Sequence, residues 1–319
     1  MLAEFAALYQ KPSSPGTHWP SDSPSPAVYD PPGALCTGAS CILHRFPIPK
    51  HRSVERLAIA AVLPYIHIGP LTLGTYGLLV ATGLLFAFFV LQADLRRRQL
   101  AADPHTIVGL TGLVGLLGAK LYHLLESPAE FFAHPFRLLI SPLGFAFYGG
   151  LLGGLLALLL LARHYRMPLL AMLDIASPAA ALGYGIGRIG CLISGDGDYG
   201  IPSSLPWAMS FPNGLVPTTE RVHPTPIYEF LVAAIIFYCL WRLGTRSLHV
   251  TRPAGEVFGY YLVLSGGARF LVEFIRLNPR SVFGLTNAQA ASLLSILAGV
   301  AILLAVRQRI PAAQRPGRE

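Results

Sequence analysis

A few ionisable side chains interrupt otherwise apolar stretches of this 319-residue sequence, and they are where chemistry is expected. They are Lys120, Asp174, Arg188, Glu229, Arg269 and Glu273, with Arg276 just beyond the last stretch. A charge inside a bilayer costs roughly 2.5–3.5 kcal/mol on insertion scales, so each of these groups needs a partner or a function. One structural interpretation is that they only neutralise one another where helices pack.

The spacing of these groups favours a more specific interpretation. Arg269, Glu273 and Arg276 stand at i, i+4 and i+7, which is one face of a helix, so an Arg269–Glu273 ion pair is expected. A guanidinium is a planar donor that binds a phosphate through two parallel hydrogen bonds. Arg188 and Arg269 together therefore predict a site for the phosphate of a lipid headgroup.

The segment GYGIGRIGCLISGDGDYG, Gly183 to Gly200, is rich in small residues. It contains a match to the dinucleotide-binding fingerprint, but that fingerprint has meaning only between a strand and the opening of a helix, and this match lies late in an apolar stretch. We instead expect close helix packing through Gly183 and Gly187, followed by a loop from Gly195 that lines a wet cavity.

Four further side chains in or after this segment have simple alternatives. Asp196 and Asp198 supply too few oxygens for the six to eight ligands of a calcium ion, so no metal site is predicted. Cys191 could be a nucleophile, but a cysteine near the end of a membrane helix is more often a small packing residue. His223 is a lone histidine in the loop before the fifth span, and a lone histidine more often has no catalytic role. Its neighbours in the sequence nevertheless favour a functional role.

The elements that must position these residues are membrane-spanning helices. Hydrophobic residues make up 53% of the chain and charged residues 13%, too little polar surface to cover a soluble globule of this size. Seven stretches approach the roughly 20 apolar residues that cross a bilayer. They run from about Leu73 to Leu91, His105 to Leu125, Leu143 to Ala162, Leu169 to Ile189, Pro226 to Leu243, Val257 to Phe274 and Thr286 to Val306. The predicted fold class is all-α, a polytopic helical membrane protein.

The basic residues predict the orientation of the spans. The net charge of +8 reflects this topology rather than nucleic-acid binding. With the N-terminus outside, the cytoplasmic segments hold twelve arginines and the outer loops between spans hold four, as the positive-inside rule favours. The twelve are Arg96, Arg97, Arg98, Arg163, Arg166, Arg242, Arg246, Arg252, Arg307, Arg309, Arg315 and Arg318; the four are Arg137, Arg221, Arg276 and Arg280. This N-out/C-in topology places the ionisable residues of several spans near the outer face.

The predicted organisation has three parts. Residues 1–56 form a Pro/Ser-rich extension without a signal-peptide pattern, expected to be disordered although it carries basic residues on the outer side. Residues 57–308 form the membrane domain, and residues 309–319 a basic cytoplasmic tail. Cys36 and Cys41 in the extension could pair after export, whereas Cys239 is expected to be buried in a span.

Three motifs in order resemble prolipoprotein diacylglyceryl transferases. They are GRIGCLISGDGDYG, HPTPIYEF at His223 to Phe230 and ARFLVEFIR at Ala268 to Arg276. Supporting segments are GTYG around Tyr76, AFYGGLLGG around Tyr148, PWAMSFP at Pro206 to Pro212 and LTNAQAASLLSI before the last span. The resemblance covers about residues 65–306.

The resemblance implies an activity. Members of this family transfer the diacylglyceryl group of phosphatidylglycerol to the lipobox cysteine thiol of a bacterial preprolipoprotein, forming a thioether and releasing glycerol phosphate. The expected partners are phosphatidylglycerol, lipobox signal peptides and membrane lipids, without nucleic acid, metal or cofactor. The expected location is the bacterial inner membrane, with the site on the extracytoplasmic side of a monomer.

Site residues follow from the motifs and from the resemblance together. The predicted catalytic residues are Arg188, Arg269, Glu273, Tyr148 and His223. The predicted substrate-binding residues are Tyr76, Arg188, Gly149, Gly150, Asp196, Gly200, Tyr228, Glu229 and Arg276. Arg188 and Arg269 would hold the departing phosphate in the transition state, and Glu273 would orient Arg269.

The chain departs from the family pattern at the group that activates the thiol. Many members have His at the position of Tyr148, Asn at the positions of Cys191 and Ser194, and Glu at the position of Asp196. This chain also has one residue more before Gly200. Tyrosine is a poor base at its reference pKa near 10. The candidates for the group that activates the thiol are therefore His223, Glu229, the loop acids and the positive field of the arginines. Three rival functions also stay open: a transferase with another acceptor, a transporter or lipid-binding protein, and an inactive paralogue.

Overall fold

A computed structural model describes residues 62–141, 144–246 and 253–308, all within one compact unit, Lys50–Glu319. Seven helices of this part are long and apolar enough to cross a membrane, so the prediction of about seven spans is confirmed and the chain is a multi-pass membrane protein. They are α3 (Thr75–Arg97), α4 (Pro104–Glu126), α7 (Phe147–His164), α8 (Leu169–Ser194), α9 (Thr225–Arg246), α10 (Glu256–Val272, continued by the 3-10 turn η1, Glu273–Ile275) and α11 (Asn287–Gln308). The predicted N-terminal extension and C-terminal tail, with Cys36 and Cys41, lie outside the described residues.

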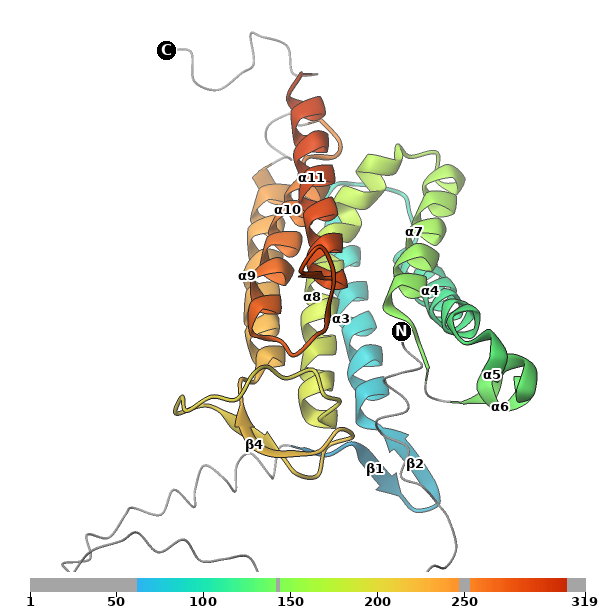
Figure 1. Cartoon of the computed structure of the whole chain (residues 1–319). Coiled ribbons are helices and arrows are strands. Elements are labelled where there is room, and N and C mark those ends of the chain that lie inside the picture. Colours follow the sequence, from blue (N-terminus) through green and yellow to red (C-terminus); the bar gives the residue numbers. More distant parts are fainter. Residues whose placement is uncertain (1–61, 142–143, 247–252, 309–319) are drawn as a thin grey trace, which may run out of the picture. The chain divides into compact units, whose positions relative to one another are not determined.

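The all-α prediction missed three antiparallel β-hairpins between the spans. The strands are β1 (Tyr65–Ile68) with β2 (Leu71–Gly74), β3 (Met209–Phe211) with β4 (Thr218–Val222), and β5 (Arg280–Val282) with β6 (Leu285–Thr286). Two short helices, α5 (Pro128–Ala133) and α6 (Pro135–Ile140), join α4 to α7. The hairpins β1–β2 and β3–β4 and the short helices α5 and α6 lie at the lower end of the helices in Figure 1, which we call the hairpin end. The other end of the helices is called the opposite end.

Glycines let several helix pairs approach closely. A Cβ on Gly83 of α3 would lie 3.0 Å from the Gly183 carbonyl of α8, so the predicted packing through Gly183 is confirmed. The prediction for Gly187 is wrong, because a Cβ there would meet nothing within 4 Å. Gly185 and Gly190 pack instead, the first against α9 and the second against α3.

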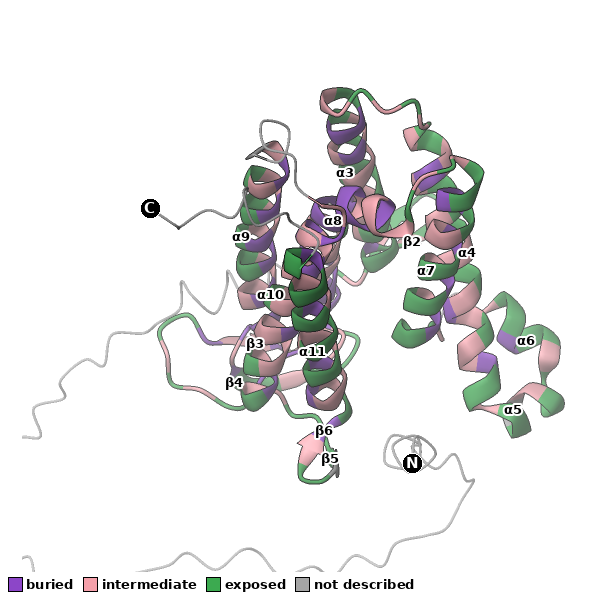
Figure 2. Cartoon of the chain, turned by 90° about the horizontal axis from the view of Figure 1, so that it is seen from above, coloured by how far each residue is buried: buried purple, intermediate pink, exposed green. Residues whose placement is uncertain are grey.

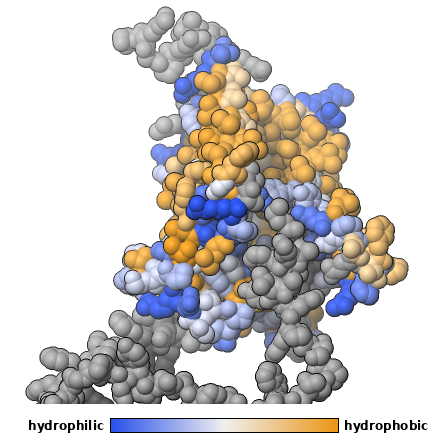
Figure 3. Space-filling model, in the orientation of Figure 1, coloured by the Kyte–Doolittle hydropathy of each residue, from blue (hydrophilic) through white to orange (hydrophobic). Residues whose placement is uncertain are grey.

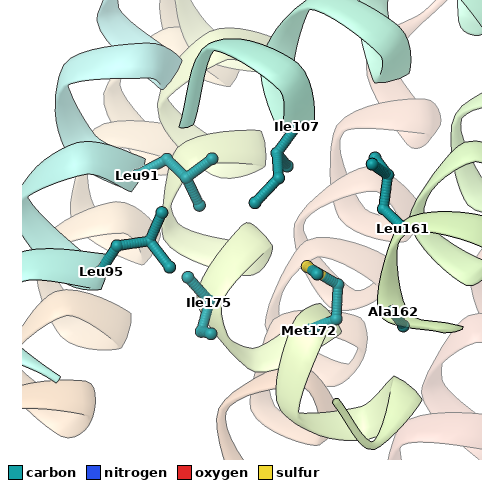
Figure 4. Packing of buried hydrophobic residues seen from close by; sticks show 7 residues of the cluster. All are labelled: Leu91, Leu95, Ile107, Leu161, Ala162, Met172 and Ile175. Carbon is teal, nitrogen blue, oxygen red and sulfur yellow. The ribbon is translucent and has the colours of Figure 1, made fainter. Parts of the chain in front are cut away.

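Five helices, α3, α8, α9, α10 and α11, form one group. Helices α4 and α7 pack against each other as a pair beside α3 and α8 (Figure 2). A buried apolar cluster joins the pair to the group at the opposite end (Figure 4). It consists of Leu91, Leu95, Ile107, Leu161, Ala162, Met172 and Ile175. Apolar residues cover most of the visible helical surface in Figure 3, as helices that face lipid require.

The structural interpretation of the sequence supposed that Asp174 of α8 neutralises a cation, but within the described residues its hydrogen bonds are to backbone amides. Its buried carboxylate accepts hydrogen bonds from the backbone amides of Gly255 and Phe258, both at 2.7 Å, and so caps the start of α10. Lys120 donates to the Ser141 carbonyl at 2.9 Å. Cys239 was predicted to be buried, but it lies on an exposed face of α9.

Candidate functional site

A network of three arginines and three acids occupies the hairpin end of the five-helix group. It consists of Arg188 near the end of α8, Asp198 in the loop after α8, Glu229 in the first turns of α9, Arg269 near the end of α10, Glu273 in η1, and Arg276 directly after η1. The prediction that ionisable residues of separate spans meet at one face is therefore confirmed.

Glu229 is the centre of the network. Its Oε1 accepts hydrogen bonds from Arg269 Nη1 and from the Tyr184 hydroxyl, both at 2.7 Å. Its Oε2 accepts from Arg276 Nη1 at 3.3 Å and lies 3.5 Å from Arg188 Nε. The carboxylate is buried, so this multiple pairing offsets the cost of its desolvation. One acid thus holds all three guanidiniums in place.

Glu273 orients Arg269 from the same helical face. Arg269 Nη2 lies 3.1 Å from Glu273 Oε2, which confirms the pair expected from the i, i+4 spacing. Asn278 Nδ2 donates to the other carboxylate oxygen of Glu273 at 2.5 Å. The sequence prediction missed Asn278 and Tyr184, although Tyr184 stands four residues before Arg188, whose guanidinium lies 4.9 Å from the Tyr184 ring centroid.

Asp198 joins Arg188 to Arg276. Its two carboxylate oxygens accept one hydrogen bond from each guanidinium. Burial alone would raise the pKa of Asp198, but the charges of Arg276 and Arg188 outweigh it and hold the pKa below its ordinary value. This carboxylate is therefore ionised at neutral pH. From the sequence, Asp198 was a rejected calcium ligand and one of the loop acids that could activate the thiol, but it was not predicted as a partner of the arginines.

A second set of side chains lies on the other flank of Arg188. Arg188 Nη1 lies 3.9 Å from Cys191 Sγ, and Cys191, Asp196 and Asp198 place ligand atoms within 4.8 Å of one another. Burial, and then the charge of Asp198, raise the pKa of Asp196. Because two guanidiniums already bind Asp198, this set does not suit a cation. Tyr76 is in electrostatic range of these groups, and its ring packs where Gly190 lacks a side chain.

Gly200 ties the loop to the rest of the site. Its amide donates to the His223 carbonyl at 2.9 Å, and it forms an isolated β-bridge with Arg276. A Cβ at Gly200 would lie 2.5 Å from the Ile275 carbonyl oxygen and 2.9 Å from the Cβ of His223. Only glycine therefore fits at this position, where the backbone of the loop crosses between the backbones of His223 and Arg276. We call this contact the crossing at Gly200.

His223 is held by a short chain of hydrogen bonds. Its Nδ1 lies 3.2 Å from the Tyr228 hydroxyl, and the Trp207 indole N–H donates to the same hydroxyl at 2.7 Å. The indole is a donor only, so the Tyr228 oxygen accepts from it, and the second lone pair of that oxygen accepts from His223 Nδ1–H in the tautomer that leaves Nε2 unprotonated. Tyr228 directly precedes Glu229 on α9, which places this chain next to the network.

Tyr148, Gly149 and Gly150 lie away from these groups, on α7. No hydrogen bond or ion pair of the described residues joins Tyr148 to the network, and its ring contacts that of Phe147. A Cβ on Gly149 would come 2.3 Å from the Gly118 carbonyl of α4, so this glycine serves the α4–α7 packing. The predicted roles of these three residues in binding or catalysis stay predictions.

The arrangement is suited to binding an anion. The three arginines and three acids of the network sum to zero charge, and their side chains are 0–30% exposed. Arg269 donates to Glu229 through Nη1, and its Nη2 lies 3.1 Å from Glu273 Oε2, which leaves further N–H groups of its fork for a ligand. Fixed guanidiniums in a partly dry site can stabilise negative charge that develops on a phosphate.

Known sequences resemble this chain over the whole membrane domain. The sequence model of the family described as prolipoprotein diacylglyceryl transferase matches residues 64–305. A phosphatidylglycerol–prolipoprotein diacylglyceryl transferase of Nitrosomonas europaea is 35% identical over 255 residues, which are 75% of this chain and 87% of that protein. Proteins of the same name from Clostridium tetani and Geobacter sulfurreducens are each 33% identical, over 70% and 77% of this chain and 90% and 95% of their own lengths.

Proposed function

The chain belongs to the prolipoprotein diacylglyceryl transferase family, a family of transferases that catalyse the first step of lipoprotein maturation, and we propose how its own residues carry out this transfer. The donor is phosphatidylglycerol and the acceptor is the lipobox cysteine thiol of a preprolipoprotein. The thiol loses its proton, a bond forms between sulfur and the glyceryl carbon, and the bond from that carbon to the phosphate oxygen breaks. Glycerol phosphate leaves with the electron pair.

Arg188 and Arg269 act as the phosphate clamp. The phosphodiester carries one negative charge, and a second develops on the departing oxygen as the carbon–oxygen bond breaks. Guanidiniums fixed by Glu229 and Glu273 stabilise that second charge more than they stabilise the bound substrate, which lowers the barrier. The network at the end of α8 and α10 is the observation that carries this proposal.

Activation of the acceptor thiol has two sources in this chain. A thiol placed beside the arginines is deprotonated more easily, because a positive field lowers its pKa. His223, held through Nδ1 by Tyr228, offers Nε2 as the base that receives the proton. Tyr148 is the alternative that the family pattern suggests.

We propose that the hairpin end faces the extracytoplasmic side of the bacterial inner membrane. The arginines at the ends of α3, α7 and α9 stand at the opposite end, which the positive-inside rule assigns to the cytoplasm. Exported signal peptides and outer-leaflet phosphatidylglycerol then meet at the network. All six charged residues of the network come from one chain, which supports a monomeric active unit.

The direct test is transfer by the purified full chain. Labelled phosphatidylglycerol in vesicles is supplied with a lipobox peptide, and with a control peptide that carries Ser in place of the lipobox Cys. We expect label on the cysteine peptide only, and rescue of a bacterium depleted of its own diacylglyceryl transferase. Folded protein that transfers no lipid would refute the proposal and favour a lipid-binding protein or an inactive paralogue.

A further inference from the structure

We infer that Asp198 holds the place of the lipid phosphate. Its carboxylate occupies Arg188, which is one arginine of the phosphate clamp, and the neighbouring Arg276 until a singly charged phosphodiester displaces it, and this exchange makes Asp198 a residue that selects monoanionic headgroups. The inference rests on the proposed function, because it needs a phosphate to enter the same network. It assigns to Asp198 a role in choosing the donor lipid.

The position of Asp198 in the chain suits such an exchange. Glu229 and Glu273 lie on helical turns with side chains that are 5% and 0% exposed, whereas the Asp198 side chain lies on a loop and is 30% exposed. Gly195 and Gly197 precede it with positive φ of 60° and 95°, conformations that glycine adopts without strain. Asp198 is thus the acid of the network that can leave without moving a helix.

The backbone of Asp198 is anchored separately from its side chain. The Thr225 hydroxyl donates to the Asp198 carbonyl oxygen at 2.5 Å, and the Asp198 amide donates to the Asp196 carboxylate at 3.2 Å. The ion pairs of the side chain are with Arg188 and Arg276. Rotation of this one side chain toward the exposed side therefore frees both guanidiniums while the loop stays in place.

The arginines remain positioned when Asp198 leaves. Glu229 Oε2 lies 3.5 Å from Arg188 Nε and 3.3 Å from Arg276 Nη1, and its Oε1 holds Arg269 at 2.7 Å. The N–H groups that Asp198 gives up are on Arg188 Nη1 and Arg276 Nη2. A phosphate presents two oxygens to a pair of guanidiniums much as a carboxylate does, so it can take over the same donors.

Charge matching gives the exchange its selectivity. The network is neutral with Asp198 bound, and it stays neutral when a phosphodiester of charge −1 takes the place of the carboxylate. A partly buried site penalises any uncompensated charge. Phosphatidylglycerol carries an uncharged glycerol beyond its phosphate, whereas a zwitterionic headgroup would bring an ammonium toward three arginines. After cleavage, glycerol phosphate that is still bound carries one more negative charge than the phosphodiester did. The carboxylate of Asp198 then returns to the arginines and helps to expel this product.

The test uses the purified full chain and the variant Asp198→Asn, with Glu220→Gln as a control that removes one exposed acid from strand β4 at the same end. Initial rates are measured against the mole fraction of phosphatidylglycerol and against added glycerol phosphate. In Asp198→Asn we expect the KM for phosphatidylglycerol and the inhibition constant of glycerol phosphate each to fall about tenfold, equivalent to about 1.4 kcal/mol. Phosphatidylethanolamine should also inhibit this variant more strongly than wild type. Unchanged or higher constants in an active variant would overturn the inference.

One further measurement and a second variant keep the inference separate from the proposed function. Stabilisation of each protein against heat by glycerol phosphate does not require turnover, and it should be greater for Asp198→Asn than for wild type. A wild-type chain that transfers no lipid contradicts the proposed function, whereas active variants with wild-type constants contradict only the exchange. If Asp198→Asn unfolds, Asp198→Ser is used; loss of the fold in both would identify Asp198 as a structural counter-charge and refute the exchange.

Discussion

Buried acids bind arginines at both ends of this protein, but they do so in different ways. At the opposite end Asp94, whose side chain is fully buried, pairs with Arg97 and Arg98, three and four residues later on the same helix α3. Arg97 also donates to the Thr245 hydroxyl at 2.5 Å, and its guanidinium carbon lies 3.9 Å from the ring centroid of Trp241 on α9. This cluster holds two helices together.

At the hairpin end the partners come from α8, its following loop, α9 and α10. Each acid there is shared by at least two arginines, and the side chains are up to 30% exposed. An ion pair between nearby residues of one helix is sufficient to neutralise a buried charge, so no ligand is needed to explain the pairs at the opposite end. Convergence of four elements on one partly open network is what a ligand site requires. Substitutions at the two ends test this difference.

The largest effect is expected for Arg188→Ala. Removal of one guanidinium from the phosphate clamp should lower kcat/KM for transfer about 10³-fold, because charge on the leaving oxygen loses its stabilising donor. Arg188→Lys should recover a small part, since an ammonium keeps the charge without the planar fork. Transfer rates and melting temperatures of both variants check this. Similar rates for the alanine variant and wild type would contradict the clamp.

A smaller loss is expected for Gly200→Ala. The added Cβ would lie 2.5 Å from the Ile275 carbonyl oxygen, so the bridge between Gly200 and Arg276 must open and the network must shift. We expect about a 10²-fold lower rate, as displacements of about 1 Å can cause, together with a lower melting temperature. Gly187→Ala is the matched control, since a Cβ there meets nothing within 4 Å and should leave both quantities near wild type. Equal behaviour of the two variants would show that the crossing at Gly200 is unimportant.

Asp94→Asn should change stability rather than catalysis. It leaves two guanidiniums near a buried amide, and loss of one partner of a buried ion pair typically costs about 3–5 kcal/mol. The rate of transfer per folded molecule should stay within about twofold of wild type, because no group of the network is touched. Thermal unfolding and active-fraction measurements check this. A large loss of rate with an unchanged melting temperature would assign chemistry to the opposite end.

The smallest and most specific effect concerns the base. His223→Gln should lower kcat/KM and change its dependence on pH, since glutamine cannot accept a proton as an imidazole does. Tyr148→Phe should leave both as in wild type, because no hydrogen bond or ion pair of the described residues joins Tyr148 to the network. The opposite pattern would move the base to Tyr148 on α7.

The sequence predicted the features that depend on local spacing. Seven apolar stretches became seven helices, and the i, i+4 spacing of Arg269 and Glu273 became an ion pair. The i, i+4 pair is set by the helix itself, so no knowledge of tertiary structure was needed.

Features that depend on how separate helices meet could not be predicted. Asp198 bridges Arg188 and Arg276 because three chain segments converge, and neither residue spacing nor composition reports such convergence. The strands of the hairpins are two to five residues long and gave no periodic signal. Asp174 was read as a counter-charge, but its partners are backbone amides of α10 that the sequence could not place nearby.

The most direct measurement removes one arginine from each end and compares transfer with stability in the two variants. Arg269→Ala should lower transfer from labelled phosphatidylglycerol to a lipobox peptide, measured per folded molecule, as strongly as Arg188→Ala. Arg97→Ala should lower the melting temperature and leave transfer per folded molecule nearly unchanged. Full activity in Arg269→Ala, or equal losses of transfer in both, would contradict a phosphate clamp at the hairpin end.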